Sequence, residues 1–272
     1  TRSGMSSFLR SALGILLPLV AALVSTASPG AVAPLPRAHA HNDYEHARPL
    51  LDALDQGFCS VEADIHLVEG ELRVAHDLPE TRPGRTLQSL YLEPLRERVR
   101  ANGGRVYPEG PLFTLLVDLK TDAATTYPRL REVLSGYRDI LTVFRNDRTA
   151  TNAVTVILSG NRPWETLAAE TERLAGLDGR LPDLDRAFSP HLVPLVSDNW
   201  RNHFRWDGTG PFPEAERTKL LGLVRRAHAN GQRIRFWAAP DRPEVWRVHA
   251  DAGVDLINTD KLAELAAFLR GR

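Results

Sequence analysis

The sequence predicts an α/β protein folded as a single (β/α)8 barrel, the TIM-barrel architecture. Strand-like apolar segments alternate with segments of helical periodicity eight times over roughly 240 residues, which is the count and size of such a barrel. No glycine-rich phosphate loop follows the first strand, which disfavours the doubly wound open sheet as the alternative. The chain of 272 residues is 43% hydrophobic and 25% charged, values that are ordinary for one large globular domain.

The first strand, helix and second strand are the clearest part of the pattern. Residues 37–42 read as a strand, and the helix at 48–57 has Pro49 in its first turn and Gly57 at its left-handed end. The second strand follows at 60–68. A strand, a helix and a strand within about thirty residues indicate a parallel βαβ unit.

The alternation continues to the end of the chain. Further strands are expected at 113–120, 153–160, 175–180, 192–200, 233–239 and 254–260, and further helices at 87–101, 127–137, 162–174, 214–229 and beyond residue 261. Of these, 175–180 is the weakest strand prediction. The segment 199–213, rich in Trp, Asn, Gly and Pro, is predicted to be a lid over the mouth of the barrel.

Residues 1–33 have the pattern of a secretory signal peptide. Arg10 precedes the apolar run LGILLPLVAALV, and Ala31 and Ala33 form an A-x-A cleavage site. We therefore expect a secreted protein whose mature domain is 34–272. The apolar run is short for a membrane span, and a retained N-terminal anchor is the alternative. Cys59 is the only cysteine, so no intramolecular disulfide is expected.

The charge composition limits the possible partners. Lysine plus arginine and aspartate plus glutamate number 34 each, so the chain lacks the basic bias of a typical nucleic-acid binder, and nucleic acid is not an expected partner. No strongly basic amphipathic helix is evident, and any membrane contact is expected to be transient. A monomer is the expected state.

Three acidic residues predict a metal site. Glu62 and Asp64 are two residues apart on a strand, so both side chains project from one face. Two carboxylates in one small space raise each other's pKa unless a cation lies between them, which favours a divalent metal. The strand FTLLVDLK adds Asp118 and Lys120 on one face. Oxygen ligands alone favour Mg²⁺ or Ca²⁺ over zinc.

Two histidines add groups that move protons near neutral pH. His41 ends the first strand and His76 follows the second. Active sites of such barrels form at the C-terminal ends of the strands, where all of these candidates fall. A lone E-x-D on a strand is most often a solvent-facing edge, but the co-occurrence of the four motifs favours a functional site. For His39 a structural role is favoured, and His66 is expected to support the site.

The motifs His41-Asn42, Glu62-x-Asp64, His76-Asp77 and Asp118-x-Lys120 resemble those of the superfamily of glycerophosphodiester phosphodiesterases, phosphatidylinositol-specific phospholipases C and sphingomyelinases D. The similarity spans nearly the whole mature chain and includes RFWAAPDRPEVWRVHADAGVDLINTDKL, which is similar to the closing strand, helix and strand of the glycerophosphodiester branch. Within this PI-PLC-like superfamily, the chain is most similar to a poorly characterised branch.

The resemblance implies a small-molecule or lipid phosphodiester as substrate. It implies that Asn42 is a fourth metal ligand, for which a turn or helix-capping role is the alternative, and that Trp237 lines the leaving-group pocket, for which a core role is equally expected. The metal and Lys120 would neutralise the phosphodiester, while His41 and His76 divide the general base and general acid roles.

The resemblance leaves the reaction's outcome open. In similar enzymes a neighbouring hydroxyl of the substrate often attacks first and gives a cyclic phosphate, so a hydrolase and a lyase of the sphingomyelinase D type both remain. A non-catalytic metal-binding module and a barrel lyase or isomerase that acts on sugars also stay open. The glycerophosphodiester enzymes usually carry H-R-G where this chain has His41-Asn42-Asp43, so their phosphate-binding arginine is missing at its usual place.

Overall fold

The strands at the centre of the molecule close into a parallel barrel. The computed structural model describes Thr1 and residues 32–272. The barrel strands, in the order in which they pair, are β1 (Leu35–Ala40), β2 (Phe58–Val68), β4 (Phe113–Leu119), β7 (Val154–Gly160), β9 (Ala175–Gly179), β10 (Leu195–Asn199), β11 (Arg233–Trp237) and β12 (Leu256–Thr259). Pairing of β12 with β1 closes the ring. The predicted TIM barrel, including its weakest strand, is therefore confirmed.

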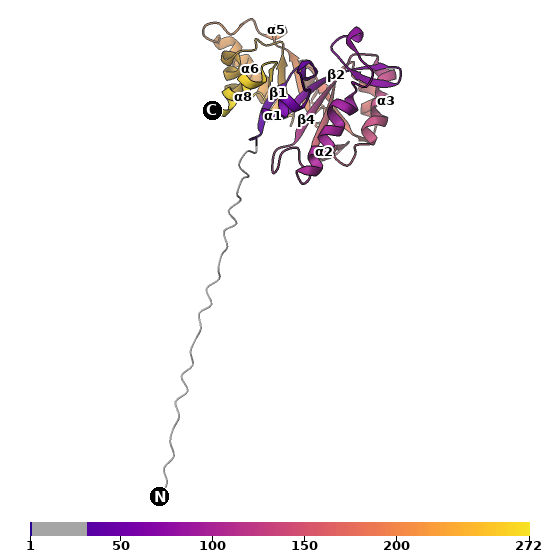
Figure 1. Cartoon of the computed structure of the whole chain (residues 1–272). Helices are drawn as coiled ribbons and strands as arrows, with labels where there is room; N and C mark the ends of the chain where they lie inside the picture. Colours follow the sequence, from indigo (N-terminus) through magenta and orange to yellow (C-terminus); the bar gives the residue numbers. More distant parts are fainter. Residues whose placement is uncertain (2–31) are drawn as a thin grey trace. The chain divides into compact units, whose positions relative to one another are not determined.

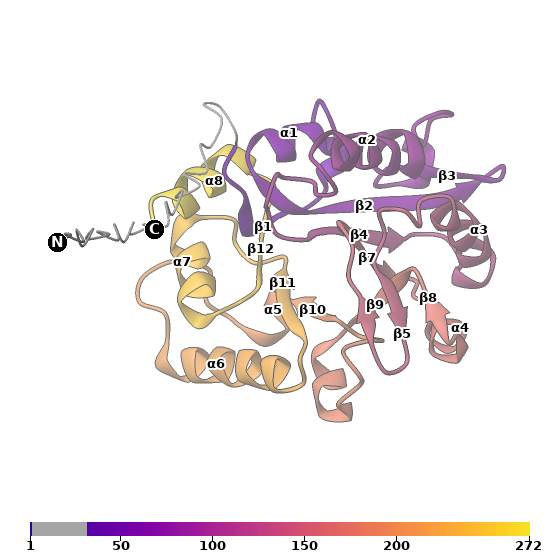
Figure 2. The same ribbon diagram turned by 90° about the horizontal axis from the view of Figure 1, so that it is seen from below.

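Helices surround the barrel, as Figures 1 and 2 show. The helices are α1 (Leu51–Asp55), α2 (Glu93–Ala101), α3 (Ala123–Ser135), α4 (Trp164–Ala169), α5 (Trp200–His203), α6 (Glu214–Ala229), α7 (Pro243–Ala252) and α8 (Leu262–Arg270). Short turns of helix complete the layer at η1 (Asp43–Glu45), η2 (Leu78–Glu80), η3 (Gln88–Leu92) and η4 (Leu181–Arg186). The fifth strand, β9, is followed only by the 3-10 turn η4.

Helix α6 illustrates how the outer layer is attached. Leu220, Val224 and Ala227 recur at helical spacing, so they share one face, and all three are buried. Helix α7 begins with Pro243, whose fixed φ suits a first turn, and ends before Gly253, whose φ of 84° terminates the helix. The helix at 214–229 therefore forms as its spacing predicted, and α7 forms in the segment whose family resemblance implied a helix.

Side chains inside the barrel change from apolar to polar toward its C-terminal mouth. Leu116, Ile157, Leu195 and Leu256 form a separate apolar cluster, one from each of four strands. In β2, alternation turns Val61 and Ile65 outward into the main hydrophobic core, while Glu62 and Asp64 face inward. The fold thus seals the barrel with an apolar layer and leaves charged groups above it.

A hairpin that the sequence patterns did not predict follows the second strand. β2 is eleven residues long, and its final part pairs antiparallel with β3 (Glu71–Val74). The turn uses Glu69 and Gly70, which both have positive φ. The hairpin reverses the chain and returns His76 to the neighbourhood of Asp64. The strand predicted at 60–68 forms, but its antiparallel partner was not predicted.

The predicted helix at 162–174 was wrong in its second half. α4 ends at Ala169, and Glu172–Arg173 form β8, which pairs with β5 (Val143–Arg145). β5 also pairs with β6 (Thr149–Ala150) to complete a small antiparallel sheet. The buried Arg173 donates to the backbone carbonyls of Glu170 and His191, and these bonds replace a continued helix.

The segment predicted to be a lid contributes its aromatic side chains to the core. Trp200 and Phe204 are buried and stack with ring centroids 3.9 Å apart, and Trp200 meets Phe236 of β11 edge to face. Trp206 and Phe212 are buried in the same cluster. These contacts fix the segment against the outer face of the sheet, so the lid interpretation was wrong for its aromatic residues.

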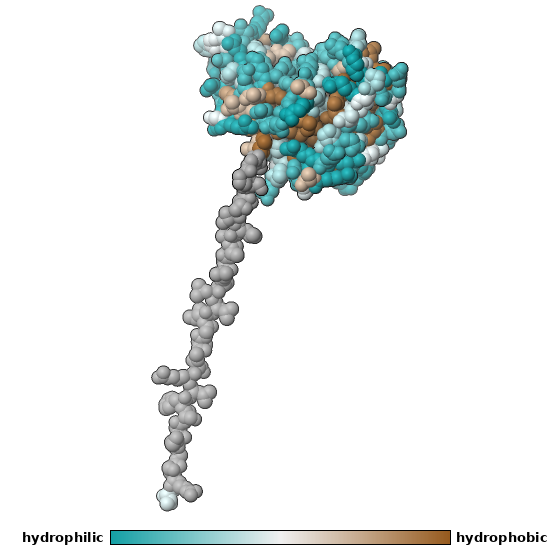
Figure 3. All heavy atoms as spheres, in the orientation of Figure 1, coloured by the Kyte–Doolittle hydropathy of each residue, from teal (hydrophilic) through white to brown (hydrophobic). Residues whose placement is uncertain are grey.

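The outer surface is largely hydrophilic. On the face drawn in Figure 3, apolar side chains gather near the middle, with smaller groups toward the right edge. Within residues 32–272, Leu51 and Leu78 are the large apolar side chains that are exposed. No helix in the described part of the chain has both the length and the hydropathy needed to span a membrane. The predicted signal peptide lies almost wholly outside the described residues.

Candidate active site

Three carboxylates meet inside the mouth of the barrel. Glu62, Asp64 and Asp118 each place an oxygen atom so that all three oxygens lie within 4.8 Å of one another. The parallel register of β2 and β4 sets Asp64 directly beside Asp118. Their side chains are only 8%, 2% and 16% exposed, respectively. The predicted acidic triad is therefore assembled by two neighbouring strands.

Gly160 leaves space for Asp118. It ends β7 beside β4 with a φ of +67°, a conformation that L side chains rarely adopt. A Cβ atom there would collide with Asp118 Oδ1 and would lie 2.6 Å from the carbonyl oxygen of Leu119. Only glycine fits this position without displacing the carboxylate.

Two cations already neutralise part of the acidic charge. Arg235 Nη2 donates to Glu62 Oε2 at 3.0 Å, and this guanidinium is almost completely buried. Lys120 Nζ lies 2.9 Å from Asp64 Oδ2 and 3.4 Å from Asp118 Oδ1. Burial alone would raise the pKa of Glu62, but the charge of Arg235 outweighs it and holds that pKa well below its usual range.

The remaining charge fits a bound cation. Burial, with the neighbouring Glu62, raises the pKa of Asp64 to about 6, and burial also raises the pKa of Asp118. Asp64 Oδ1 is buried and has no hydrogen-bond partner within residues 32–272. A buried carboxylate oxygen without a donor is costly, and a hard divalent cation held by Glu62, Asp64 and Asp118 would satisfy it. The residues therefore fit a metal, whose identity the donor set leaves open.

His41 is held by a carboxylate on the far side of its ring. Its Nδ1 lies 2.7 Å from Asp260 Oδ1, and its Nε2 lies 3.8 Å from Glu62 Oε2. Burial by itself would lower the pKa of His41, but the bond to Asp260 and the charge of Glu62 together raise it. The ring is thus oriented with Nε2 toward the acids, which suits transfer of a proton.

His76 contacts the cluster at Asp64, with the hydroxyl of Tyr44 bonded to both. The Tyr44 hydroxyl lies 2.7 Å from Asp64 Oδ2 and 3.0 Å from His76 Nδ1. Because the carboxylate can only accept, the hydroxyl donates to Asp64 and accepts from a protonated Nδ1. His66 Nε2 lies 3.2 Å from the carbonyl oxygen of Ala75 and 3.3 Å from that of His76, so it supports the backbone here.

Asn42 lies beside the cluster, with Tyr44 between them. Its backbone is left-handed, with φ of 47°, and its amide oxygen is 2.8 Å from the Tyr44 hydroxyl. Buried Asp43 accepts a hydrogen bond from the Leu50 amide and fixes the same loop. Asn42 thus occupies a turn, and its amide lies next to Tyr44, the residue that bonds Asp64.

The other predicted residues lie at different depths. Trp237 follows Arg235 by two residues on β11, so it shares the inward face and is half-buried near the mouth. His39 is fully buried, bonds Ser60 Oγ at 2.7 Å, and has a pKa lowered to about 3 by burial and by Arg235. This environment agrees with its predicted structural role.

Sequence reasoning missed Arg235 and Tyr44. One signal for Arg235 was present: it lies two residues before Trp237 in the strand RIRFW, so both side chains project from the same face. Tyr44 lies two residues after Asn42, but no pattern in the sequence indicated that its hydroxyl reaches Asp64.

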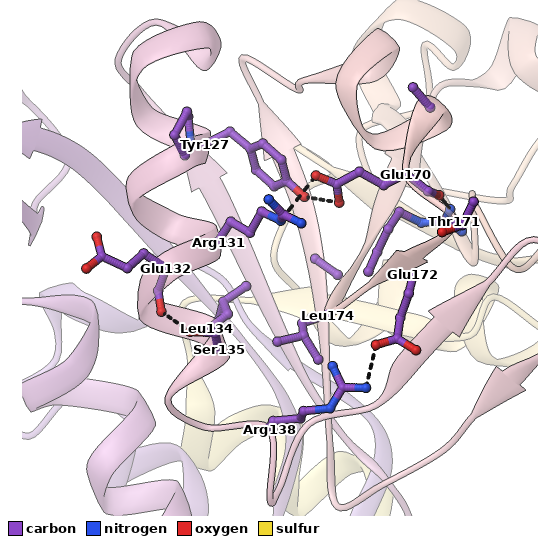
Figure 4. A pocket seen from close by; sticks show the side chains of 14 residues that line it. Tyr127, Arg131, Glu132, Leu134, Ser135, Arg138, Glu170, Thr171, Glu172 and Leu174 are labelled. Atoms are coloured by element: carbon purple, nitrogen blue, oxygen red, sulfur yellow. Dashed lines mark hydrogen bonds and ion pairs between the residues drawn. The ribbon is translucent and has the colours of Figure 1, made fainter.

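A groove away from the barrel mouth lies in the outer layer of the described residues. It has a volume of about 690 Å³ and is lined by α3 and by residues 169–175 on the outer layer. Figure 4 shows Tyr127 and Arg131 meeting Glu170 across it, and Arg138 meeting Glu172. None of the acids or histidines of the barrel mouth lines this groove, so its size carries no catalytic meaning.

Comparison with solved structures supports the fold. A glycerophosphodiester phosphodiesterase from Parabacteroides distasonis superposes with a TM-score of 0.52 and 14% identity, over 87% of this chain and 97% of its own. One from Agrobacterium tumefaciens gives a TM-score of 0.51 and 19% identity, over 88% of this chain and 100% of its own.

Comparison of sequences is more specific. The protein named altered inheritance of mitochondria protein 6 from Eremothecium gossypii is 32% identical over 86% of this chain and 69% of its own length. A homolog from Arthroderma benhamiae is 27% identical over 84% of this chain and 82% of its own. A glycerophosphoryl diester phosphodiesterase family model matches residues 233–263. A model described as an AIM6-like phosphodiesterase domain matches residues 29–177. The chain belongs to this AIM6-like family, within the superfamily that contains the glycerophosphodiester phosphodiesterases and phosphatidylinositol-specific phospholipases C.

Proposed function

We propose that this protein is a metal-dependent phosphodiesterase that cleaves glycerophosphodiesters or phospholipid headgroups by histidine acid–base catalysis. The observation that carries the proposal is the convergence of His41 and His76 on one buried acidic triad, His41 next to Glu62 and His76 next to Asp64. Two groups able to move protons, both beside a cation site, suit the displacement of one phosphate ester oxygen by another.

The charges of the site suit a phosphodiester. A divalent cation held by Glu62, Asp64 and Asp118 would supply positive charge for the phosphoryl oxygens. Lys120 Nζ, 30% exposed along its side chain, reaches the mouth beside the acids and binds a phosphoryl oxygen as charge builds on it. The pKa of Lys120 is raised, since Asp118 and Asp64 outweigh the effect of burial, so it stays protonated.

The two histidines take different roles in this proposal. His41 Nε2 accepts the proton of the attacking hydroxyl, because Asp260 at Nδ1 stabilises the imidazolium that forms. His76, whose Nδ1–H donates to Tyr44, presents Nε2–H to the leaving oxygen. A hydroxyl of the substrate as nucleophile gives a cyclic phosphate, and water as nucleophile gives a monoester.

The activity is tested with the whole chain supplied with Ca²⁺ or Mg²⁺. Glycerophosphocholine, lysophosphatidylcholine and phosphatidylinositol are incubated separately, and phosphorus NMR separates monoester from cyclic product. Turnover of at least one substrate is expected. Tight metal uptake by calorimetry with no turnover of any of them would contradict the proposal and favour a non-catalytic binding module.

Substitution of the histidines tests their roles. His41→Ala is expected to lower kcat by at least about a hundredfold. His76→Ala should lower kcat by as much for a substrate with an alkyl leaving group. It should lower kcat much less for a nitrophenyl ester, because nitrophenolate leaves without a proton. His228→Ala is the matched control, because this exposed histidine pairs with Asp255 away from the acidic triad. Equal losses for His76→Ala with both leaving groups would overturn its assignment as the acid.

We also propose that the protein is secreted as a monomer that acts without nucleic acid. The support is the leader pattern of residues 1–33 and the balanced charge. Mass spectrometry of protein recovered from the culture medium should give Pro34 as the first residue. Retention of the leader on a cell-bound protein would contradict secretion.

A further inference from the structure

A second group of charged residues lines the barrel mouth beside the acidic triad. Arg162 follows β7 and Arg180 follows β9, so both are at the C-terminal ends of barrel strands. Arg162 Nη1 donates to the carbonyl oxygen of Asp178, and Arg180 donates to Asp178 Oδ2 at 2.8 Å. The two guanidinium groups are therefore anchored on the same residue of β9.

The carboxylate of Asp178 balances only one of the two arginines. It is fully buried and is shared by Arg180, Ser159 and Ser197. Among the described residues, Arg162 has no carboxylate within 4.0 Å, although Asp178 and Asp183 attract it from farther away. Among the charges around half-buried Arg162, Arg180 has the largest effect and repels it, whereas Asp178, Asp183 and Asp118 each attract it more weakly.

This imbalance disfavours the charged form of Arg162. Burial and the charge of Arg180 both lower the pKa of Arg162. Its Nη1 has a backbone acceptor, but neither Nε nor Nη2 has a hydrogen-bond partner within residues 32–272. An anionic group presented at the mouth would accept from these donors and relieve the repulsion.

Distance separates this cation from the phosphate that the triad would bind. Asp118 is on β4, whereas Arg162 is anchored on β9, and β7 lies between them. Two strand spacings place the backbone of Asp118 roughly 10 Å from that of Asp178, although the charge of Asp118 still acts on Arg162. In the proposed function, Lys120, which lies beside Asp118, already binds the phosphoryl oxygens next to the triad. An anion at Arg162 is therefore a different part of the same ligand.

We propose that the substrate carries a second anionic group, a carboxylate or a phosphate, which Arg162 binds while the scissile phosphodiester lies at the triad. This inference rests on the proposed function and specifies its substrate class. Cationic or neutral headgroups such as choline lack this contact. Arg180 acts as a positioning residue, because its own charge is held by Asp178 and its repulsion keeps Arg162 turned to the ligand.

The test compares two substrates that differ by one carboxylate, glycerophosphoserine and glycerophosphoethanolamine, with the whole metal-loaded chain. The wild type should favour the serine compound by about tenfold in kcat/KM, the value of one charge-assisted hydrogen bond. Arg162→Gln should bring that ratio close to one through KM, and Arg162→Lys should restore part of it. Arg131→Gln in the outer groove is the control and should leave the ratio unchanged.

Two results overturn the inference. The first is a wild type without preference for the serine compound. The second is an Arg162→Gln variant that loses activity equally on both substrates, because that pattern assigns Arg162 to the scissile phosphate or to the fold. A glycerol phosphate diester that bears a phosphorylated inositol distinguishes a phosphate from a carboxylate as the preferred group.

Failure of the proposed function gives a separate signature. If neither compound is turned over, calorimetric titration with phosphoserine and phosphoethanolamine tests Arg162 without catalysis. Tighter binding of phosphoserine, by about tenfold and dependent on Arg162, supports the anion site even in a protein without activity. Equal affinities in the wild type overturn it.

Discussion

Tyr44 connects three polar groups of the site through a single hydroxyl. It is buried, donates to Asp64 Oδ2 and contacts both Asn42 Oδ1 and His76 Nδ1. Tyr44→Phe keeps the ring and removes only these bonds. We expect metal affinity to fall by about tenfold and kcat to fall further, because Asp64 loses a donor and His76 loses its orientation. Calorimetric metal titration and kcat with a phosphodiester measure the two effects.

Tyr127→Phe is the matched control for this substitution. The Tyr127 hydroxyl also bonds a carboxylate, that of Glu170, but it does so in the outer groove shown in Figure 4. Tyr127→Phe should change neither metal affinity nor kcat by more than about twofold. Equal effects of the two substitutions would mean that Tyr44 contributes only general stability.

For single residues, the sequence predicts contacts between side chains that lie close together along the chain. Glu62 and Asp64 share a face because strand side chains alternate, and the same rule pairs Asp118 with Lys120. The contact between Arg235 and Glu62 joins residues 173 positions apart, so no local rule connects them. Only closure of the barrel brings β11 within reach of β2. Tyr44 was missed for a related reason, since its direction depends on a left-handed backbone at Asn42.

The end of β7 must approach β4 closely, and Gly160 provides that approach. Gly160→Ala places a Cβ against Asp118 Oδ1 and forces an unfavourable φ. We expect a loss of about 3 kcal/mol or more in the free energy of unfolding and at least a tenfold loss of metal affinity. Urea denaturation and calorimetric metal titration measure the two effects.

Gly70→Ala distinguishes the effect of backbone strain from the effect of a steric collision. Gly70 has a φ of +81° in the β2–β3 turn, but nothing lies within 4 Å of a Cβ built there. This variant should lose about 1–2 kcal/mol from the backbone conformation alone and keep its metal affinity. If Gly160→Ala behaves like Gly70→Ala, the close packing of β7 against Asp118 does not matter for the site.

Elements were predictable where periodicity was long, and less so where tertiary contacts override it. The sixteen-residue α6 and the strand FTLLVDL form as predicted. The segment 162–174 has helical spacing, but Arg173 finds better partners by turning toward β5 and the carbonyl of His191. The β2–β3 hairpin was missed because one continuous strand of alternating residues looks the same whether its partner is parallel or antiparallel.

Across the whole molecule, the site makes the stability depend on pH and on metal together. Burial and Glu62 raise the pKa of Asp64 to about 6, whereas the unfolded chain releases this proton near pH 4. The folded state therefore binds more protons in this window, and the metal-free protein loses stability as pH rises from about 4 to about 6. The raised pKa of His41 acts in the same direction above pH 6, because its stabilisation is lost as pH rises through the folded value. Glu62, with a lowered pKa, loses its stabilising effect only as the pH falls below its unfolded value of about 4.5.

A divalent cation should restore the stability that the metal-free protein loses as the pH rises. It would bind the ionised carboxylates of the folded protein, so excess Ca²⁺ at a hundred times its Kd should add about 2.7 kcal/mol above pH 7. At pH 4.5 the same ion competes with the proton on Asp64 and should add little. Urea unfolding with CaCl₂ or with a chelator, at pH 4.5 and 7.5, measures both quantities.

Asp64→Asn tests whether the dependence of stability on pH and on the cation comes from Asp64. The amide removes the buried ionisation, so the metal-free variant should be more stable than the metal-free wild type at pH 7.5, by about 1–3 kcal/mol. It also removes a ligand, so Ca²⁺ should no longer stabilise the protein and turnover should be lost. Such a variant would be more stable and inactive, which is the behaviour of a residue kept for its chemistry. Equal stabilisation by Ca²⁺ in the wild type and in Asp64→Asn at pH 7.5 would place the cation somewhere other than the acidic triad.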